Sequence, residues 1–169
     1  MRSREQFFES NYVVLRGQPP MRWMERLFLR LTDGWYPRLV DLPTGAGKTD
    51  VAVIWVLALA WYGLDPGTRK PVPRRLVWVV NRRVLVQQVF RLADRLQEKL
   101  SVGGADSGSL GDVREGLARL SGDGTEVFGI VQLRGQLIDD REWSVAPSVP
   151  QLIIGTVDQI GSRLLFQGY

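Results

Sequence analysis

The run Val51–Leu64 is the feature that most limits how this chain can fold. It contains 14 consecutive residues without a charged side chain. A bilayer crossing needs about 20 apolar residues, so the run is too short for a transmembrane helix. A helix that is apolar all round must instead be buried by other parts of the protein. We therefore predict a helix over Gly47–Tyr62 that is enclosed on most sides.

Short apolar segments and helical patterns alternate around this buried helix. The segments of strand length are Arg38–Leu42, Leu76–Val80, Val127–Leu133 and Gln151–Ile154. The helical patterns are Arg83–Leu100, with Val89, Leu92, Leu96 and Leu100 as its buried stripe, a short one near Val113–Leu120, and Asp158–Phe166. Loops are expected at Ser101–Gly111 and Arg134–Pro150. This alternation predicts an α/β fold, with a mostly parallel sheet flanked by helices.

The chain has neither histidine nor cysteine. Structural zinc sites, Ser-His-Asp and Cys-His nucleophiles, and His-Asp metal nucleases are therefore excluded from it, and any metal must be bound by oxygen. The 169 residues suggest one domain. The first twenty residues carry acidic side chains and have no signal-peptide pattern, so we expect a cytoplasmic protein that is not associated with a membrane.

A phosphate-binding loop is predicted between the first strand segment and the buried helix. Gly45 and Gly47 permit positive φ, so that backbone N–H groups can surround phosphate oxygens. Lys48 would reach the β- and γ-phosphates of a nucleotide, and the Thr49 hydroxyl would coordinate Mg²⁺. The predicted nucleotide-binding residues are Pro43, Thr44, Gly45, Ala46, Gly47, Lys48 and Thr49, of which Lys48 and Thr49 are the catalytic candidates. The alternative is a glycine-rich turn with an incidental lysine.

The segment Leu42–Thr49 resembles motif I of superfamily 2 DExD/H helicases, with Leu42 where the strict pattern has glycine. Four further segments resemble, in order and spacing, the helicase-nuclease of type I CRISPR interference: Pro20–Phe28, Val79–Gln88, Gln132–Gly135 and Ile153–Tyr169. The resemblance implies an N-terminal extension over 1–20 and the first part of a RecA-like, P-loop NTPase domain over 21–169. It also implies that the chain binds ATP, Mg²⁺ and single-stranded DNA, and works with a CRISPR effector complex and the remainder of the helicase-nuclease.

Three segments that follow predicted strands are candidates for nucleic-acid contact. In the family, the segment after the second strand contacts the backbone, which assigns this role to Asn81, Arg82 and Arg83. From the residues alone, Asn81 is equally a helix cap, and the two arginines are equally solvated surface charges. The other candidates by resemblance are Arg134 and Gly135, which alone would be an ordinary turn, and Thr156 and Asp158, of which Thr156 is also a plausible helix cap.

Two other groups of residues have simpler interpretations. Related helicases read adenine with a glutamine where this chain has Met24, which cannot form the paired amide hydrogen bonds. Either the chain does not select adenine, or Gln18 reads it. Trp23, Leu27 and Phe28 are expected to form a helix face that packs on the domain. The acidic residues Asp139, Asp140 and Glu142 are expected to be a solvated loop rather than a metal site.

The resemblance places a second acidic motif, the second RecA-like domain and its arginine finger beyond Tyr169. We therefore expect these 169 residues to bind nucleotide weakly and not to unwind DNA by themselves. Two other functions fit the same residues. One is a translocase of a restriction or repair system, and the other is a non-catalytic nucleotide- or nucleic-acid-binding module derived from a helicase.

Overall fold

The computed structural model describes residues 3–101, 110–122, 127–133 and 148–166. The helices in these ranges are α1 (Arg4–Arg16), α2 (Arg22–Thr32), the short 3-10 helix η1 (Lys48–Asp50), α3 (Val51–Leu64), α4 (Arg83–Leu100), α5 (Gly111–Ser121) and α7 (Val157–Phe166). The strands are β1 (Arg75–Val80), β2 (Gly129–Gln132) and β3 (Gln151–Thr156). No helix in the described ranges is long and apolar enough to cross a membrane.

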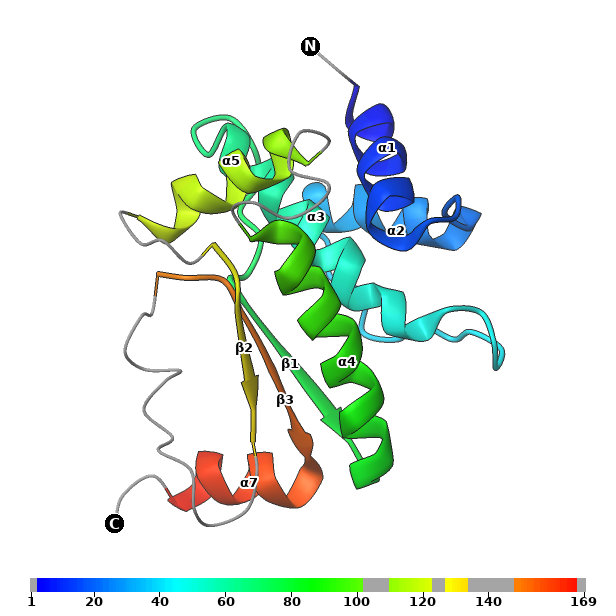
Figure 1. Ribbon diagram of the computed structural model, residues 1–169, viewed down its shortest axis with the longest axis vertical. Helices are drawn as coiled ribbons and strands as arrows, with labels where there is room; N and C mark the ends of the chain where they lie inside the picture. The colour runs from blue at the N-terminus through cyan, green and yellow to red at the C-terminus, as the bar shows by residue number, and fades with distance from the viewer. Residues whose placement is uncertain (1–2, 102–109, 123–126, 134–147, 167–169) are drawn as a thin grey trace.

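The three strands form one parallel sheet in the order β1-β3-β2 (Figure 1). β3 is the central strand, and Leu152 and Ile154 on it are fully buried. Arg75 pairs with Gln151, and the register continues to Val80 opposite Thr156. The predicted α/β class with a parallel sheet is therefore confirmed. Each strand of the sheet overlaps one of the predicted apolar segments.

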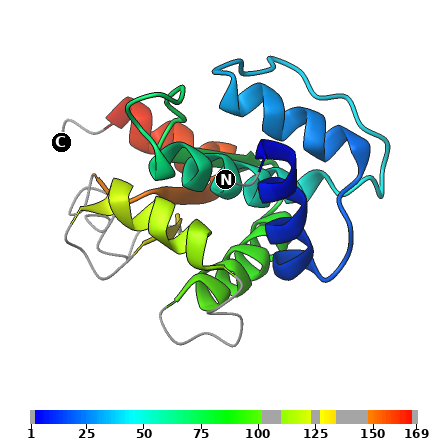
Figure 2. The same ribbon diagram turned by 90° about the horizontal axis from the view of Figure 1, so that it is seen from above.

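Helix α3 lies at the centre of the core. Its most extensive contacts are with α5, α2 and α1, which lie on different sides of it when the molecule is viewed from above (Figure 2). Ten of its residues are buried, from Ala52 to Gly63. This confirms the buried helix predicted from the apolar run. The helix proper starts at Val51, because Lys48–Asp50 form a tighter 3-10 turn before it.

Glycine allows α3 and α5 to touch through their backbones. A Cβ atom built on Gly116 would collide with the carbonyl oxygen of Ala60, and one built on Gly63 would collide with the carbonyl oxygen of Gly116. Side chains at these two positions would force the helices apart. The contact between α3 and α5 therefore depends on the absence of side chains at both glycines.

Helix α1 contributes aromatic side chains to the same core. Phe7, Phe8 and Tyr12 are almost completely buried. The rings of Phe8 and Phe28 stack with their centroids 4.7 Å apart, which joins α1 to α2. The buried side chains Leu27 and Phe28 confirm that α2 packs one face on the domain, as expected.

The predicted strand Arg38–Leu42 is wrong. These residues form no strand, and Leu39 and Val40 are 81% and 42% exposed. An isolated extended segment gains neither ladder hydrogen bonds nor burial, and no described strand lies beside this one. Pro37 and Pro43 flank it and lack the N–H groups that a ladder requires.

The remaining predicted elements agree with the structure where it describes them. The helix over Arg83–Leu100 has the predicted bounds, and its stripe Val89, Leu92, Leu96 and Leu100 is buried. α5 and α7 extend the two shorter predicted helices by one or two residues. Most of the two predicted loops lies outside the described residues, including the acidic side chains Asp139, Asp140 and Glu142.

Candidate functional site

The loop before α3 has the backbone conformation that its glycines were expected to provide. Gly45 and Gly47 have φ values of +85° and +70°. The N–H of Ala46 donates to the carbonyl of Pro43, which closes a turn at 3.3 Å. A Cβ on Gly45 would meet nothing within 4 Å, so the space beside it is open. Lys48 is exposed and forms no ion pair with any described residue.

Helix α2 packs against this loop. The indole N–H of Trp23 donates to the carbonyl of Ala46 at 3.0 Å. Met24 is buried, and its Cε would lie 2.8 Å from a Cβ built on Gly47. Met24 therefore fills the space next to Gly47. Gln18, the other candidate for base recognition, is exposed in the segment between α1 and α2.

Asp50 is a buried acidic residue directly after the Gly-Lys-Thr sequence, and it was not among the site residues predicted from the sequence. It is 2% exposed, and the hydroxyl of Tyr12 donates to its Oδ2 at 2.6 Å. Arg16 Nε lies 3.0 Å from Oδ1, although its N–H points elsewhere and has no hydrogen-bond acceptor. From α1, Arg16 therefore offsets the charge of Asp50 and Tyr12 orients its carboxylate at the N-cap of α3. A single charge at the border of a long apolar run is the signal that could have revealed it.

Burial raises the pKa of the Tyr12 hydroxyl, and the hydrogen bond to the negatively charged Asp50 raises it further. Both effects favour the protonated phenol, because a phenolate here would lack water and face a carboxylate. Tyr12 therefore remains a hydrogen-bond donor to Asp50 throughout the physiological pH range.

Thr49 lies on the wall of a pocket that α1 and α4 form with the loop. Arg16, Gln88, Arg91, Leu92 and Arg95 line the rest of the pocket. Lys48 is not part of this wall. The structure thus places the loop beside the middle of α4 rather than at the end of a strand.

The candidate nucleic-acid residues after β1 and β3 are neighbours in space. Val80 and Thr156 are paired in the sheet, so Asn81–Arg83 and Thr156–Asp158 leave it side by side. Asn81, Arg82, Arg83 and Asp158 are all exposed, whereas Thr156 is 8% exposed. Two arginines and a helix start at one sheet edge form a surface that phosphate groups can reach. Arg134 and Gly135 lie outside the described residues.

The expected cap of α4 differs from the observed one, whereas Thr156 directly precedes the first residue of α7, as expected for its cap. Asn81 does not cap α4, because Arg82 occupies the N-cap position and no side chain there accepts a hydrogen bond. At the start of α7, the backbone N–H of Thr156 donates to Oε1 of Gln159 at 3.0 Å. The Gln159 side chain therefore fastens the end of β3 to the first turn of α7.

No group of three or more acidic side chains in the described residues is arranged to hold a metal ion. Comparison of the chain with known protein families, with curated proteins and with solved structures gives no match.

Proposed function

We propose that this chain is the ATP-binding part of a superfamily 2 DNA helicase or translocase, with a RecA-like fold, acting in CRISPR interference. The observation that carries the proposal is the loop Pro43–Thr49. It combines two glycines of positive φ, open space beside Gly45, and an exposed lysine followed by threonine at the start of a buried helix. These features suit a loop that closes around phosphate oxygens.

The residues of the loop fit a nucleotide and its magnesium ion. Lys48 would bind the β- and γ-phosphates as a point charge, and the Thr49 hydroxyl would be an oxygen ligand for Mg²⁺. Bound Mg²⁺ would neutralise phosphate charge during hydrolysis. Trp23 and Met24 hold the loop from α2, and Tyr12 and Arg16 hold Asp50 from α1. The protein's contribution is thus to keep the loop in one conformation.

A single strand of DNA is the proposed second ligand. Asn81–Arg83 and Thr156–Asp158 would contact its phosphates from adjacent strand ends. Contacts of this kind carry no base sequence, which suits a motor that moves along any strand. The parallel sheet flanked by helices is compatible with the proposed RecA-like domain.

Titration of a fluorescent ATP analogue against the 169-residue chain tests the proposal. Wild type should bind the analogue in the presence of Mg²⁺, and Lys48→Ala should weaken binding by about tenfold or more, since a charge-assisted contact contributes roughly 1.5–3 kcal/mol. Lys70→Ala is the matched control, because Lys70 is exposed and lies outside the loop.

Thr49→Ala should weaken binding of the analogue more in the presence of Mg²⁺ than in its absence. If wild type and Lys48→Ala bind the analogue equally, the loop is a turn with an incidental lysine. In that case a non-catalytic module would be the better assignment for this chain.

A further inference from the structure

A basic pocket lies between α1 and α4, and it shares only Thr49 with the Gly-Lys-Thr sequence. Its volume is about 280 Å³, and we call it the arginine pocket after Arg16, Arg91 and Arg95, which line it with Gln88 and Thr49. Gln88, Arg91 and Arg95 are spaced three and four residues apart, so they share one face of α4. The hydrogen bond from Lys99 Nζ to the carbonyl of Val14, at 2.8 Å, joins α4 to α1 one turn further along.

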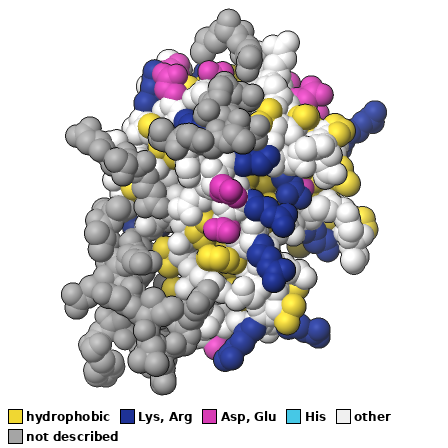
Figure 3. Space-filling model, viewed as in Figure 1, with side chains coloured by type: hydrophobic (Ala, Val, Ile, Leu, Met, Phe, Trp, Pro, Cys, Tyr) yellow, Lys and Arg dark blue, Asp and Glu magenta, His cyan; other side chains and the backbone are white. Residues whose placement is uncertain are grey.

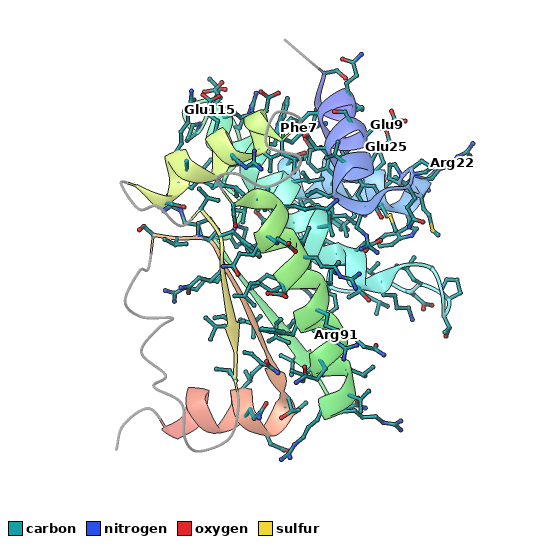
Figure 4. All side chains as sticks on the ribbon, viewed as in Figure 1. Phe7, Glu9, Arg22, Glu25, Arg91 and Glu115 are labelled. Atoms are coloured by element: carbon teal, nitrogen blue, oxygen red, sulfur yellow. The ribbon has the colours of Figure 1, made fainter. Side chains whose placement is uncertain are left out.

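The two arginines of α4 have no acidic partner in the described residues. Neither Arg91 nor Arg95 forms an ion pair or a hydrogen bond there, and both are exposed. Figure 3 shows Lys and Arg side chains gathered in a column over α4, with acidic side chains beside it. In Figure 4, Arg91 extends from α4 on the side away from the strands. Two guanidinium groups on one wall, neither in an ion pair with a described residue, favour an anion between them.

The third arginine supplies an N–H group that lacks an acceptor. Arg16 Nε is buried and unsatisfied, although Asp50 balances part of its charge. The ion pair with Asp50 holds the Arg16 side chain at the wall of the pocket. Gln88 and the Thr49 hydroxyl add neutral hydrogen-bonding groups to the same wall.

We propose that the arginine pocket binds a polyphosphate anion, either the phosphate tail of a nucleotide or free inorganic polyphosphate. Guanidinium groups bind phosphate through paired N–H donors, and Arg91 and Arg95 present such donors on one face of α4. A volume of about 280 Å³ lies near the lower end of the roughly 300–1,000 Å³ usual for ligand sites, so the pocket has room for a phosphate chain. Because Thr49 belongs to both sites, the pocket would extend the proposed nucleotide loop along α4.

Calorimetric titration with inorganic tripolyphosphate tests this site on the 169-residue chain. Wild type should bind the anion, and the double variant Arg91→Gln and Arg95→Gln should weaken binding by about tenfold or more. Both side chains are exposed, so the substitutions should leave the thermal unfolding temperature unchanged. Arg22→Gln is the matched control, since Arg22 is an exposed arginine at the N-terminal end of α2 and does not line the pocket (Figure 4).

The source of the phosphate is decided with the fluorescent ATP analogue. If the double variant weakens both ligands and tripolyphosphate displaces the analogue, the pocket holds a nucleotide tail. If only tripolyphosphate binding is weakened, it holds free polyphosphate. The proposal is overturned if wild type does not bind tripolyphosphate, if the double variant binds it as wild type does, or if only binding of a DNA oligonucleotide is reduced.

Lys48→Ala separates this inference from the proposed function. Lys48 does not line the pocket, so this variant should retain tripolyphosphate binding within a few-fold. Loss of ATP binding in Lys48→Ala, with no effect of the α4 double variant on either ligand, would sink the pocket and leave the nucleotide loop intact. If Lys48→Ala binds ATP as wild type does while the α4 double variant loses tripolyphosphate binding, the nucleotide loop is refuted and the pocket proposal stands.

Discussion

Replacement of Tyr12 by phenylalanine isolates the bond that ties α1 to the start of α3. The substitution removes only the hydroxyl, which donates to Asp50 Oδ2 at 2.6 Å in a fully buried position. The ring is retained, so its packing against Phe8 is preserved. What changes is that a buried carboxylate oxygen loses a donor.

The expected loss of unfolding free energy is about 2 kcal/mol, because hydrogen bonds to charged groups contribute roughly 1.5–3 kcal/mol. For a chain of this size that loss corresponds to a fall of roughly 4–8 °C in the unfolding temperature. Tyr62→Phe is the control, since Tyr62 on α3 forms no hydrogen bond through its hydroxyl in the described residues. It should change stability by less than about 0.5 kcal/mol.

The difference between wild type and Tyr12→Phe should also depend on pH. The pKa of Tyr12 is raised in the folded chain above its value of about 10 in the unfolded chain. The hydroxyl therefore contributes its full stabilisation below about pH 10 and loses it as the pH rises further, by at most about 1.4 kcal/mol per pH unit. Urea denaturation followed by tryptophan fluorescence at pH 7, 10 and 11 measures this. A difference that is below about 0.5 kcal/mol at pH 7, or that stays constant to pH 11, would refute the assignment of the Tyr12–Asp50 bond.

Two glycine substitutions test the backbone contacts. Gly47→Ala places a side chain at a φ of +70° with its Cβ 2.8 Å from Met24 Cε, so it should cost about 1–3 kcal/mol in urea denaturation and abolish binding of the ATP analogue. Equal nucleotide binding in this variant would contradict the role given to the loop. Gly116→Ala should cost about 3 kcal/mol, since its Cβ meets the carbonyl of Ala60, whereas Gly111→Ala on the same helix has open space and should be close to neutral. Similar stabilities for these two α5 variants would show that the helices separate without cost.

The elements of the fold could be predicted where burial and pattern agree. The run Val51–Leu64 and the stripe on α4 are periodic or continuous over many residues, and both were predicted correctly. The segment Arg38–Leu42 could not be judged from its own residues, because a strand exists only through a neighbour.

The candidate site, like the fold, could be predicted only in part from the sequence. The positive φ of Gly45 and Gly47 follows from the identity of the residues. The positions of Tyr12, Arg16, Arg91 and Arg95 around it do not, since they depend on how α1 and α4 pack. Asp50 was missed because its partners lie more than thirty residues earlier in the chain.

The strand order has a consequence for synthesis of the protein. Among the described strands, β1 and β2 both pair with β3 and not with each other, and β3 is the last of the three to leave the ribosome. Until then, Leu76, Trp78 and Val80 have no strand beside them, whereas α1, α2 and α3 can already assemble from neighbouring sequence. In the nascent chain, α1, α2 and α3 can therefore be packed together while the apolar strand β1 is still unpaired. During that interval, β1 is the segment most exposed to pairing with another chain.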